Sequence, residues 1–239
     1  MNVNGNLGDM KRLTDRFMQW ARAAYYLVGF DREFPGKTRV AAAVQHWEER
    51  QQGKGDSPRP QADWDAQYAA GDWAYLGRLE QTSRYGAIVA YLTVLAPQGA
   101  VLDVGCGEGV LFQRLRRSGY GRYVGIDLSA VAIAARAKDE DARTTFAQAD
   151  AERYQPAGLF DAIVFNESLL YFHEPLATLQ RYMQALRPGG VAIVSLHITA
   201  SPRARAITAQ VRNHAHVISE TTTHQDGNAW ACLVVDQVT

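Results

Sequence analysis

The stretch Asp103-Val104-Gly105-Cys106-Gly107-Glu108-Gly109 decides how the rest of the chain is interpreted. It follows a short apolar run at 100–104 and precedes a helical pattern at 110–118. Glycines between a strand and a helix let the backbone turn sharply and approach a ligand closely. The start of the helix then offers free N–H groups and the positive end of a dipole to an anion. A glycine-rich turn alone also fits a plain tight connection, so the neighbouring sequence has to discriminate.

The sequence after this turn alternates between short apolar runs and amphipathic segments. We expect strands at 122–126, 144–148, 160–165 and 191–196, and helices at 129–138, 175–186 and 201–213, with Pro188-Gly189-Gly190 closing the second of these helices. Near-continuously apolar strands separated by helices predict a parallel sheet covered on both faces. At 216–237 two β-rich runs flank Asp226-Gly227-Asn228 and leave no room for a crossover helix. An antiparallel hairpin is therefore expected at one sheet edge.

The first third of the chain has a different character. Residues 13–29 and 40–52 show helical spacing, and the Gly- and Pro-rich stretch 53–60 indicates a boundary. An aromatic-rich segment begins at Asp63, and a helix is expected at 83–95. The expected organisation is an N-terminal helical extension at 1–60, a lid and leading helix at 61–99, and a core domain at 100–239.

Composition excludes several classes of protein. Apolar residues make up 47% of the chain, which is enough for a sizeable core and argues against dominant disorder. Twenty-five basic residues balance twenty-five acidic ones, whereas a duplex-binding protein would carry a basic excess. Two cysteines, Cys106 and Cys232, are too few for a disulfide framework or a structural zinc site. The first residues lack the apolar region of a signal peptide, and no apolar run is long enough to span a bilayer. A soluble, cytoplasmic protein is expected.

Asp127 strengthens the interpretation of the glycine turn. It lies 22 residues after Gly105, at the end of the next expected strand. An acid in that position accepts hydrogen bonds from both hydroxyls of a ribose. The alternative role for Asp127 is a helix cap, but Ser129 is available for that role. The pattern therefore favours a nucleoside-containing cofactor.

With these residues in place, the chain resembles the class I S-adenosylmethionine-dependent methyltransferases. The segments that match in order and spacing are LDVGCGEGVL, GIDLS, QADAE, FDAIVFNESLLYF and LRPGGVAIVS. The resemblance runs from about Ser83 to the C-terminus. It implies a Rossmann-like, doubly wound α/β fold with a mostly parallel seven-stranded sheet, whose antiparallel seventh strand lies between the fifth and sixth. The implied cofactor is S-adenosyl-L-methionine, with S-adenosyl-L-homocysteine as product.

A nicotinamide dehydrogenase is the main competitor for the glycine turn and the acid. Such an enzyme usually carries G-x-G-x-x-G, whereas here the third glycine, Gly109, comes one residue earlier. A dehydrogenase also gives no reason for the closing hairpin.

The resemblance also implies roles for residues at the strand ends. Gly105, Cys106 and Gly107 would line the methionine part of the cofactor, and Asp127 would bind the ribose. The adenine would meet Leu128, Asp150 and Ala151, while the backbone carbonyl of Asn166 would lie near the methionine amine. For Asp150 the alternative is a solvated acid at a helix start.

The segment at 63–79 resembles the lid of small-molecule members of the family, including the thiopurine methyltransferase branch. Its rings would cap the cofactor and exclude water; they are Trp64, Tyr68, Trp73 and Tyr75. Plain core packing of these rings is the alternative. Arg84 is a candidate partner of the cofactor carboxylate, although a lone helical arginine is more often solvated.

Methyl transfer from a sulfonium depends mainly on positioning, and a base is needed only for an acceptor that holds its proton tightly. Candidate bases follow the fourth and fifth expected strands, where open α/β sheets place ligands; they are Glu167, Tyr171, His173 and His197. His197 is the favoured base, with a cap of the following turn as its alternative role, and His214, His216 and His224 are expected to be structural. Cys106 is not expected to be a nucleophile, and no metal site is expected.

The expected activity is methylation of oxygen on a small hydroxylated acceptor, such as a sugar or a secondary metabolite. The chain has Asn166-Glu167-Ser168-Leu169 where amide-directed N-methyltransferases carry Asn/Asp-Pro-Pro-Tyr/Phe, which argues against methylation of nucleic-acid bases or glutamine amides. Methylation of a small amine, a non-catalytic module that binds the cofactor or its product, and a protein-interaction role for residues 13–29 stay open. No nucleic-acid or membrane partner is expected, and residues 1–60 offer a possible homodimer contact.

Overall fold

The computed structural model describes residues 58–199 and 201–237, together with Phe17, Trp20, Ala21, Pro35, Gly36, Arg39 and Val40. The chain divides into two units, Met1–Gly55 and Asp56–Thr239, and the sheet and the candidate site both belong to the second unit. The helices expected at 13–29 and 40–52, and the dimer contact expected through 1–60, fall almost entirely outside the described residues. The expected domain boundaries stay predictions.

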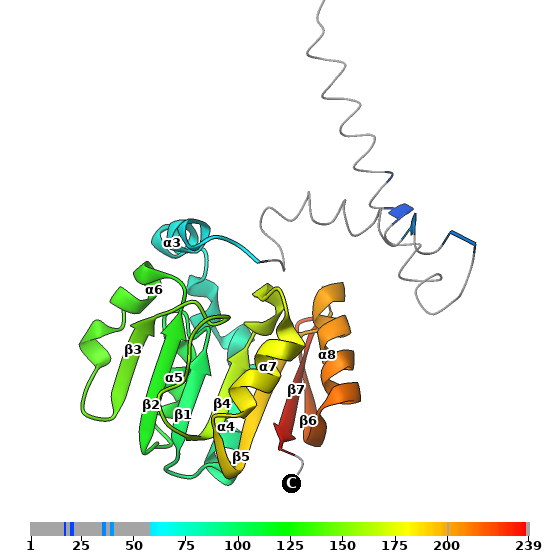
Figure 1. Ribbon diagram of the computed structural model, residues 1–239. Helices are drawn as coiled ribbons and strands as arrows, with labels where there is room; N and C mark the ends of the chain where they lie inside the picture. The colour runs from blue at the N-terminus through cyan, green and yellow to red at the C-terminus, as the bar shows by residue number, and fades with distance from the viewer. Residues whose placement is uncertain are drawn as a thin grey trace, which may run out of the picture. The chain divides into compact units, whose positions relative to one another are not determined.

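A seven-stranded sheet forms the centre of the second unit, in the order β3-β2-β1-β4-β5-β7-β6 (Figure 1). The strands are β1 (Ala100–Val104), β2 (Arg122–Asp127), β3 (Thr144–Gln148), β4 (Phe160–Asn166), β5 (Leu186–His197), β6 (His216–Gln225) and β7 (Asn228–Asp236). The pairs among β1 to β5 are parallel, whereas β7 is antiparallel to both β5 and β6. The predicted fold class is confirmed, including the insertion of the seventh strand.

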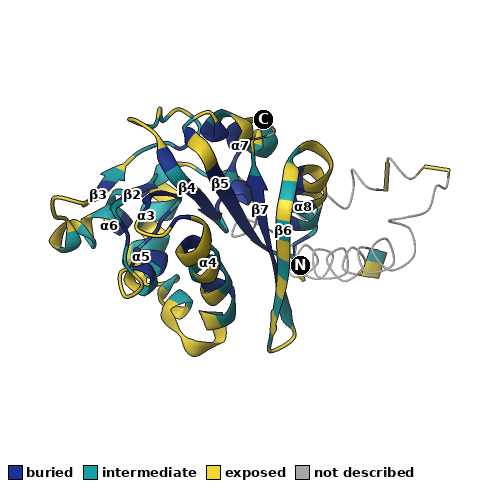
Figure 2. Ribbon diagram, turned by 90° about the horizontal axis from the view of Figure 1, so that it is seen from below, coloured by how far each residue is buried: buried dark blue, intermediate teal, exposed yellow. Residues whose placement is uncertain are grey.

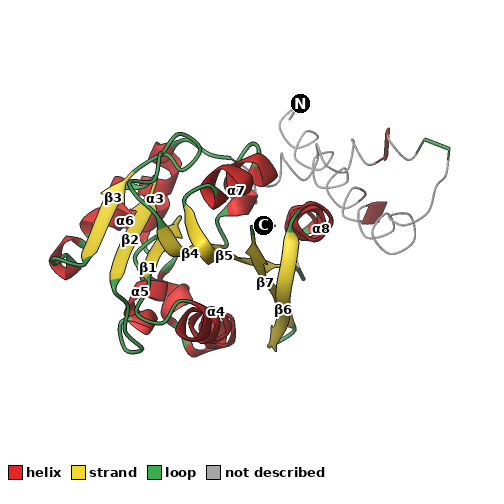
Figure 3. Cartoon of the chain, turned by 60° about the horizontal axis from the view of Figure 1, so that its bottom comes forward, coloured by secondary structure: helices red, strands yellow, loops and turns green. Residues whose placement is uncertain are grey.

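Helices cover both faces of this sheet, as Figure 3 shows. The α-helices are α3 (Gln61–Ala70), α4 (Thr82–Leu95), α5 (Val110–Leu115), α6 (Ala130–Ala134), α7 (Pro175–Met183) and α8 (Pro202–His214). Short 3₁₀ turns occur at η2 (Ala74–Gly77), η3 (Leu79–Gln81), η4 (Ala137–Asp139) and η5 (Leu169–Tyr171). One apolar cluster joins α4 and α5 to the sheet, and a second joins α7 and α8 to the opposite face. Strands β1, β4, β5 and β7 are mostly buried, whereas the edge strand β6 has no buried residue (Figure 2).

The expected start of the fifth strand was wrong. Pro188-Gly189-Gly190 lies inside β5 and does not close α7, which ends at Met183. The pairing of β4 with β5 shifts register between Phe160 and Ala162, so the extra residues of β5 form a bulge opposite Asp161. The bulge favours glycine at position 190, because a Cβ there would lie only 3.0–3.1 Å from three backbone oxygens, which is a crowded contact. A Pro-Gly-Gly sequence predicts a turn, but here both sides of it remain in the same sheet.

The C-terminal hairpin is confirmed and closes through a two-residue turn. Asp226 and Gly227 have positive φ angles of 50° and 77°, as a type I′ turn requires. None of the described helices is long and apolar enough to span a membrane.

Candidate functional site

The glycine turn lies at the carboxyl end of β1 and is fastened to β2. The N–H groups of Gly105 and Cys106 both donate to the carbonyl oxygen of Ile126, at 2.8 and 2.9 Å. Gly105 and Gly107 have φ angles of 78° and 52°, which side chains rarely adopt. A Cβ on Gly105 would lie 2.5 Å from the Ser168 Cβ, and one on Gly107 would lie 2.7 Å from the Tyr68 hydroxyl. The turn therefore requires glycine at both positions.

Asp127 is the last residue of β2 and holds the turn from the side. Its Oδ2 accepts the Gly107 N–H at 2.8 Å, and its Oδ1 accepts the Ser129 N–H at 2.9 Å. Burial raises the pKa of Asp127, the two backbone N–H groups lower it, and the negative charge of Asp65 raises it. The helix-capping role belongs to Ser129, whose Oγ accepts the Ala132 N–H. Each Asp127 oxygen keeps a further lone pair for a ligand hydroxyl.

Asp103, the first residue of the decisive stretch, was not among the site residues predicted from the sequence. Its side chain is 1% exposed, and its Oδ2 accepts the Tyr123 hydroxyl at 2.6 Å. Burial raises the pKa of Asp103 to about 7, against the opposing effect of the Tyr123 hydrogen bond. Its Oδ1 is buried without a hydrogen-bond partner among the described residues, as is the Ser168 Oγ beside Gly105. The sequence feature that could have identified Asp103 is its position as the one acidic residue within the apolar strand β1.

The residues expected near an adenine follow β2 and β3. Asp150 accepts the Glu152 N–H at 2.9 Å and approaches Arg153 at 3.5 Å, so its carboxylate also stabilises the turn at 151–153. The carbonyl of Ala151 accepts hydrogen bonds from Arg181 and from the Tyr182 hydroxyl, which tie this loop to α7. Leu128 lies between Asp127 and the Ser129 cap. The three residues share one sheet edge with Asp127, since Asp127 pairs with Gln148.

Arg84 on α4 is buried, with 2% of its surface exposed, so the alternative of a solvated arginine does not hold. Its Nη1 donates to Asn166 Oδ1 at 2.8 Å, and its Nε donates to Gln81 Oε1 at 2.9 Å. Glu167 lies 3.8 Å from the same Nη1 and has a positive φ of 60°. Arg84 thus holds the residues that end β4, and these contacts favour a positioning role over direct pairing with a cofactor carboxylate.

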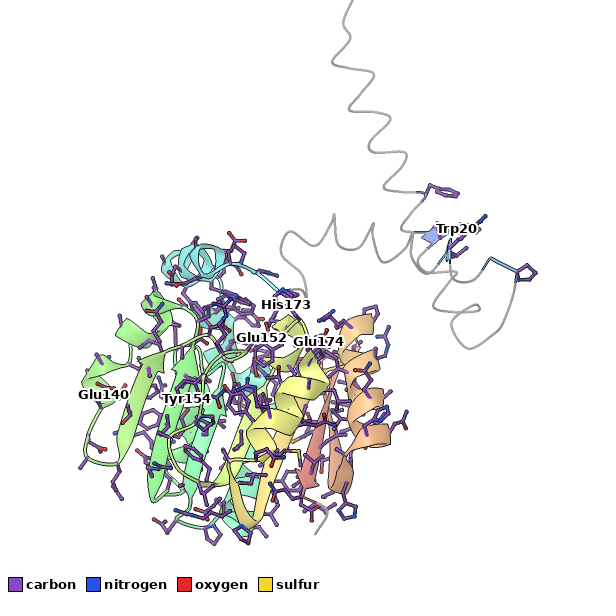
Figure 4. All side chains as sticks on the ribbon, in the orientation of Figure 1. Trp20, Glu140, Glu152, Tyr154, His173 and Glu174 are labelled. Atoms are coloured by element: carbon purple, nitrogen blue, oxygen red, sulfur yellow. The ribbon has the colours of Figure 1, made fainter. Side chains whose placement is uncertain are left out.

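The two candidate histidines lie in different surroundings. His173 is 73% exposed, and its Nδ1 lies 2.7 Å from Glu152 Oε2; both residues are labelled in Figure 4. His197 ends β5 at the same edge as Asn166, stacks on Trp230 at 5.0 Å, and places Nε2 3.0 Å from Asn228 Oδ1. The N-cap of α8 is Ser201. His216 pairs with Asp236 at the far end of the hairpin.

The aromatic segment expected as a lid packs over the glycine turn. Trp64 lies edge-on to Tyr171 at 4.7 Å, and Trp73 lies 5.9 Å from Trp64 and 6.2 Å from Tyr68. Burial and then the charge of Asp127 raise the pKa of Tyr68 well above its usual range. Figure 1 shows α3 beside α6, beyond the carboxyl ends of the parallel strands. No residue of α3 is fully buried, so this segment is not ordinary core.

The residues present fit a nucleoside cofactor with an amino-acid tail. The two glycines form a cradle that a Cβ would fill, Asp127 faces it, and the unpaired Asp103 Oδ1 and Ser168 Oγ are polar atoms that a ligand can satisfy. Burial raises the pKa of the Cys106 thiol well above its usual range, so the thiol stays protonated at neutral pH. The described residues include no group of three or more His, Cys, Asp or Glu arranged to hold a metal ion.

The protein is a Rossmann-like α/β protein with the class I methyltransferase architecture. This class is defined by the order of the strands, by the insertion of β7 between β5 and β6, and by the glycine turn at Gly105. The chain matches the methyltransferase domain family over residues 75–232, which is more than half its length, and it belongs to that family.

Curated relatives match shorter stretches. A ubiquinone biosynthesis O-methyltransferase of Aromatoleum aromaticum is 35% identical over 100 residues, covering 40% of this chain and 42% of that protein. An uncharacterized methyltransferase of Mycobacterium tuberculosis is 36% identical over 118 residues, covering 48% of this chain and 59% of that protein. The chain thus spans about half the length of these two relatives.

Solved structures share the fold at low identity. The N-methyltransferase NodS from Bradyrhizobium japonicum, in complex with S-adenosyl-L-homocysteine, superposes with a TM-score of 0.57 at 17% identity, covering 70% of this chain and 92% of that one. The [4+2]-cyclase SpnF superposes with a TM-score of 0.55 at 21% identity, covering 67% and 84%. A fold shared with a cyclase does not by itself determine the reaction.

Proposed function

We propose that the protein is an S-adenosylmethionine-dependent methyltransferase that methylates an oxygen atom of a small hydroxylated acceptor, such as a sugar or a secondary metabolite. The observation that carries the proposal is the cradle at Gly105 and Gly107, held by the Asp127 carboxylate, in a chain that belongs to the methyltransferase domain family. When bound, the cofactor supplies a methyl group activated by a sulfonium.

Residues of this chain hold the cofactor in distinct ways. Asp127 accepts from the ribose hydroxyls while its two backbone hydrogen bonds fix the orientation of the carboxylate. The adenine of the cofactor is bordered by Asp150, Ala151 and Leu128. Asn166 presents its backbone carbonyl to the amino-acid tail of the cofactor. The lid rings, including Trp73, exclude water from the reacting groups. Exclusion of water strengthens every electrostatic contact inside the site.

Oxygen as the accepting atom is supported by two observations. A relative at 35% identity is a ubiquinone biosynthesis O-methyltransferase. The loop after β4 has Asn-Glu-Ser-Leu, where amide-directed enzymes carry a proline-containing motif. An alcohol must lose its proton during transfer, so a base is part of this proposal.

His197 is the proposed base, with Glu167 and His173 as substitutes. It lies at the ligand edge of β5, and its stacking on Trp230 and its contact with Asn228 fix the ring. Glu167 lies at the same edge, 3.8 Å from the Arg84 guanidinium, and this ion pair restrains its carboxylate. His173 is exposed, and its Nδ1 already pairs with the Glu152 carboxylate.

The test is turnover to S-adenosylhomocysteine with a panel of hydroxylated and amine acceptors, measured by mass spectrometry. Methylated alcohol or phenol supports the proposal, and product only from amines makes the protein an N-methyltransferase. Cofactor that binds without turnover on any acceptor indicates a non-catalytic module. His197→Ala should lower kcat by about 10²–10⁴ with little change in cofactor affinity. A matched His216→Ala control should leave kcat unchanged; near-wild-type kcat in His197→Ala would remove His197 from the mechanism.

A further inference from the structure

Asp65 on α3 bonds directly to the start of α6. Its Oδ1 accepts the Ser129 hydroxyl at 2.6 Å and the Val131 N–H at 3.3 Å. Its Oδ2 accepts Gln61 Nε2 at 3.1 Å, which fixes the carboxylate on its own helix. Hydrogen bonding by Ser129 is the largest effect on Asp65, and it lowers the pKa of the carboxyl below its usual value. One ionised side chain thus joins α3 to the start of α6.

Ser129 contacts both the lid helix α3 and Asp127, the acid proposed to bind the cofactor ribose. It is fully buried, its N–H donates to Asp127 Oδ1, and its hydroxyl donates to Asp65. Its Oγ also caps α6 by accepting the Ala132 N–H at 3.2 Å. One residue therefore joins the carboxylate that faces the cradle to the carboxylate that anchors α3.

Tyr68 follows Asp65 by one helical turn and reaches the cradle itself. A Cβ on Gly107 would lie 2.7 Å from its hydroxyl, so the phenol covers the glycine turn from outside. Residues three apart share a helix face, so the anchor and the covering ring move together. Release of Asp65 from Ser129 would let Tyr68 leave Gly107.

Little else in α3 itself retains it. The helix has no fully buried residue, and Pro60 at its N-cap provides no side-chain cap. Among the described residues, Trp64 and Tyr68 also make ring contacts with neighbouring lid rings, Tyr171 and Arg59, and Tyr68 lies against Gly107. A helix with no fully buried residue opens at lower cost than the central strands, so the hydrogen bonds of Asp65 contribute to keeping it closed.

We propose that Asp65 is a positioning residue that latches α3 across the cradle, so that ligand reaches or leaves Asp127 only after Asp65 has released Ser129 and Val131. The latch rests on the proposed function, because the ligand it retains is the cofactor or its product. The latch does not itself touch the ligand. It therefore changes the fraction of time that the lid is open in free and in bound protein alike.

Binding kinetics separate a latch from a residue that contacts the ligand. With the latch removed, the association and dissociation rate constants of S-adenosylhomocysteine should rise together, by about three- to tenfold, as expected for loss of partly exposed hydrogen bonds. The dissociation constant, their ratio, should change less than threefold. A residue that contacts the ligand would raise the dissociation rate constant alone.

The experiment is stopped-flow fluorescence of the full chain with S-adenosylhomocysteine, using the lid tryptophans Trp64 and Trp73 as reporters. Asp65→Ala removes the latch, and Asp65→Asn keeps an oxygen acceptor for Ser129 and should restore part of the wild-type rates. Asp63→Ala is the matched control on the same helix, since Asp63 is exposed and makes no side-chain hydrogen bond or ion pair within the described part of the chain. It should behave as wild type.

Hydrogen exchange on ligand-free protein gives the second readout. Exchange across α3 should be faster in Asp65→Ala than in Asp63→Ala, while exchange in the strands stays unchanged. Unchanged rate constants with unchanged exchange would overturn the latch, and so would a rise in the dissociation rate constant alone or a fall in the association rate constant. A wild type that binds no S-adenosylhomocysteine refutes the proposed function, and the ligand-free exchange then decides the latch.

Discussion

Replacing Asp127 separates cofactor recognition from folding. Asp127→Asn keeps the shape of the side chain but presents an NH₂ group to one of the two backbone N–H groups that the carboxylate now accepts. It also removes the charge and half of the acceptor capacity that faces the cradle. Asp127→Ala removes all of these contacts.

The expected magnitude is set by those contacts. A hydrogen bond to a charged group contributes about 1.5–3 kcal/mol, so the affinity for S-adenosylmethionine or its product should fall by about one to two decades. The fold should lose less, because burial and the charge of Asp65 already raise the pKa of Asp127 and disfavour its ionised form. A neutral residue relieves that cost and offsets part of the loss of the backbone contacts.

Isothermal titration calorimetry with S-adenosylhomocysteine measures the affinity, and thermal unfolding without ligand verifies the fold. Asp141→Asn is the matched control: Asp141 Oδ1 accepts the N–H two residues ahead at 2.8 Å, as Asp127 does, but it precedes β3 at the opposite sheet edge. It should bind normally. Unchanged affinity in folded Asp127→Ala would refute the ribose assignment. Binding of NADH by the wild type would restore the dehydrogenase interpretation.

Two further predictions concern Asp103 and the lid. Because the pKa of Asp103 is raised to about 7, the folded protein keeps a proton on this carboxyl that the unfolded chain loses above about pH 4. The free energy of unfolding of the wild type should therefore fall as the pH rises to about 7. Between pH 5 and 7 this loss should be about 2 kcal/mol smaller in Asp103→Asn, measured by urea unfolding, and equal losses would contradict the assignment. Hydrogen exchange at 63–79 should slow on addition of S-adenosylhomocysteine, and equal protection with and without ligand would mean that the lid rings do not respond to ligand.

Local sequence was sufficient for the parts of the fold in which neighbouring residues determine the structure. The turn at Gly105, the Ser129 cap and the Asp226-Gly227 hairpin each depend on residues within a few positions of one another. The start of β5 could not be predicted in the same way. Its Pro-Gly-Gly bulge depends on the opposing residues Phe160 and Asp161, about thirty positions earlier, and on how closely their carbonyls approach Gly190.

The same distinction applies to the site. Gly105, Gly107 and Asp127 belong to recognisable patterns, whereas the contact of Asp65 with Ser129 joins residues 64 positions apart. Arg84 and Asn166 are 82 positions apart, and nothing in the sequence around either one indicates their hydrogen bond. Burial of Arg84 could not be predicted for this reason: an arginine is solvated unless a partner elsewhere in the chain accepts its donors.

The division of labour at the sheet edge explains how one fold can carry different reactions. In the proposed function, the cradle and Asp127 at the ends of β1 and β2 bind the cofactor and leave the acceptor unspecified. Glu167 and His197 lie at the ends of β4 and β5. The lid residue Tyr75 is close enough to this region for the charge of Arg84 to affect it: burial raises the pKa of Tyr75, and the charge of Arg84 opposes that rise. A cyclase shares this fold at 21% identity, so the fold alone does not determine the reaction. Acceptor choice in this protein should therefore respond to substitutions around β4, β5 and Tyr75 while cofactor affinity stays constant.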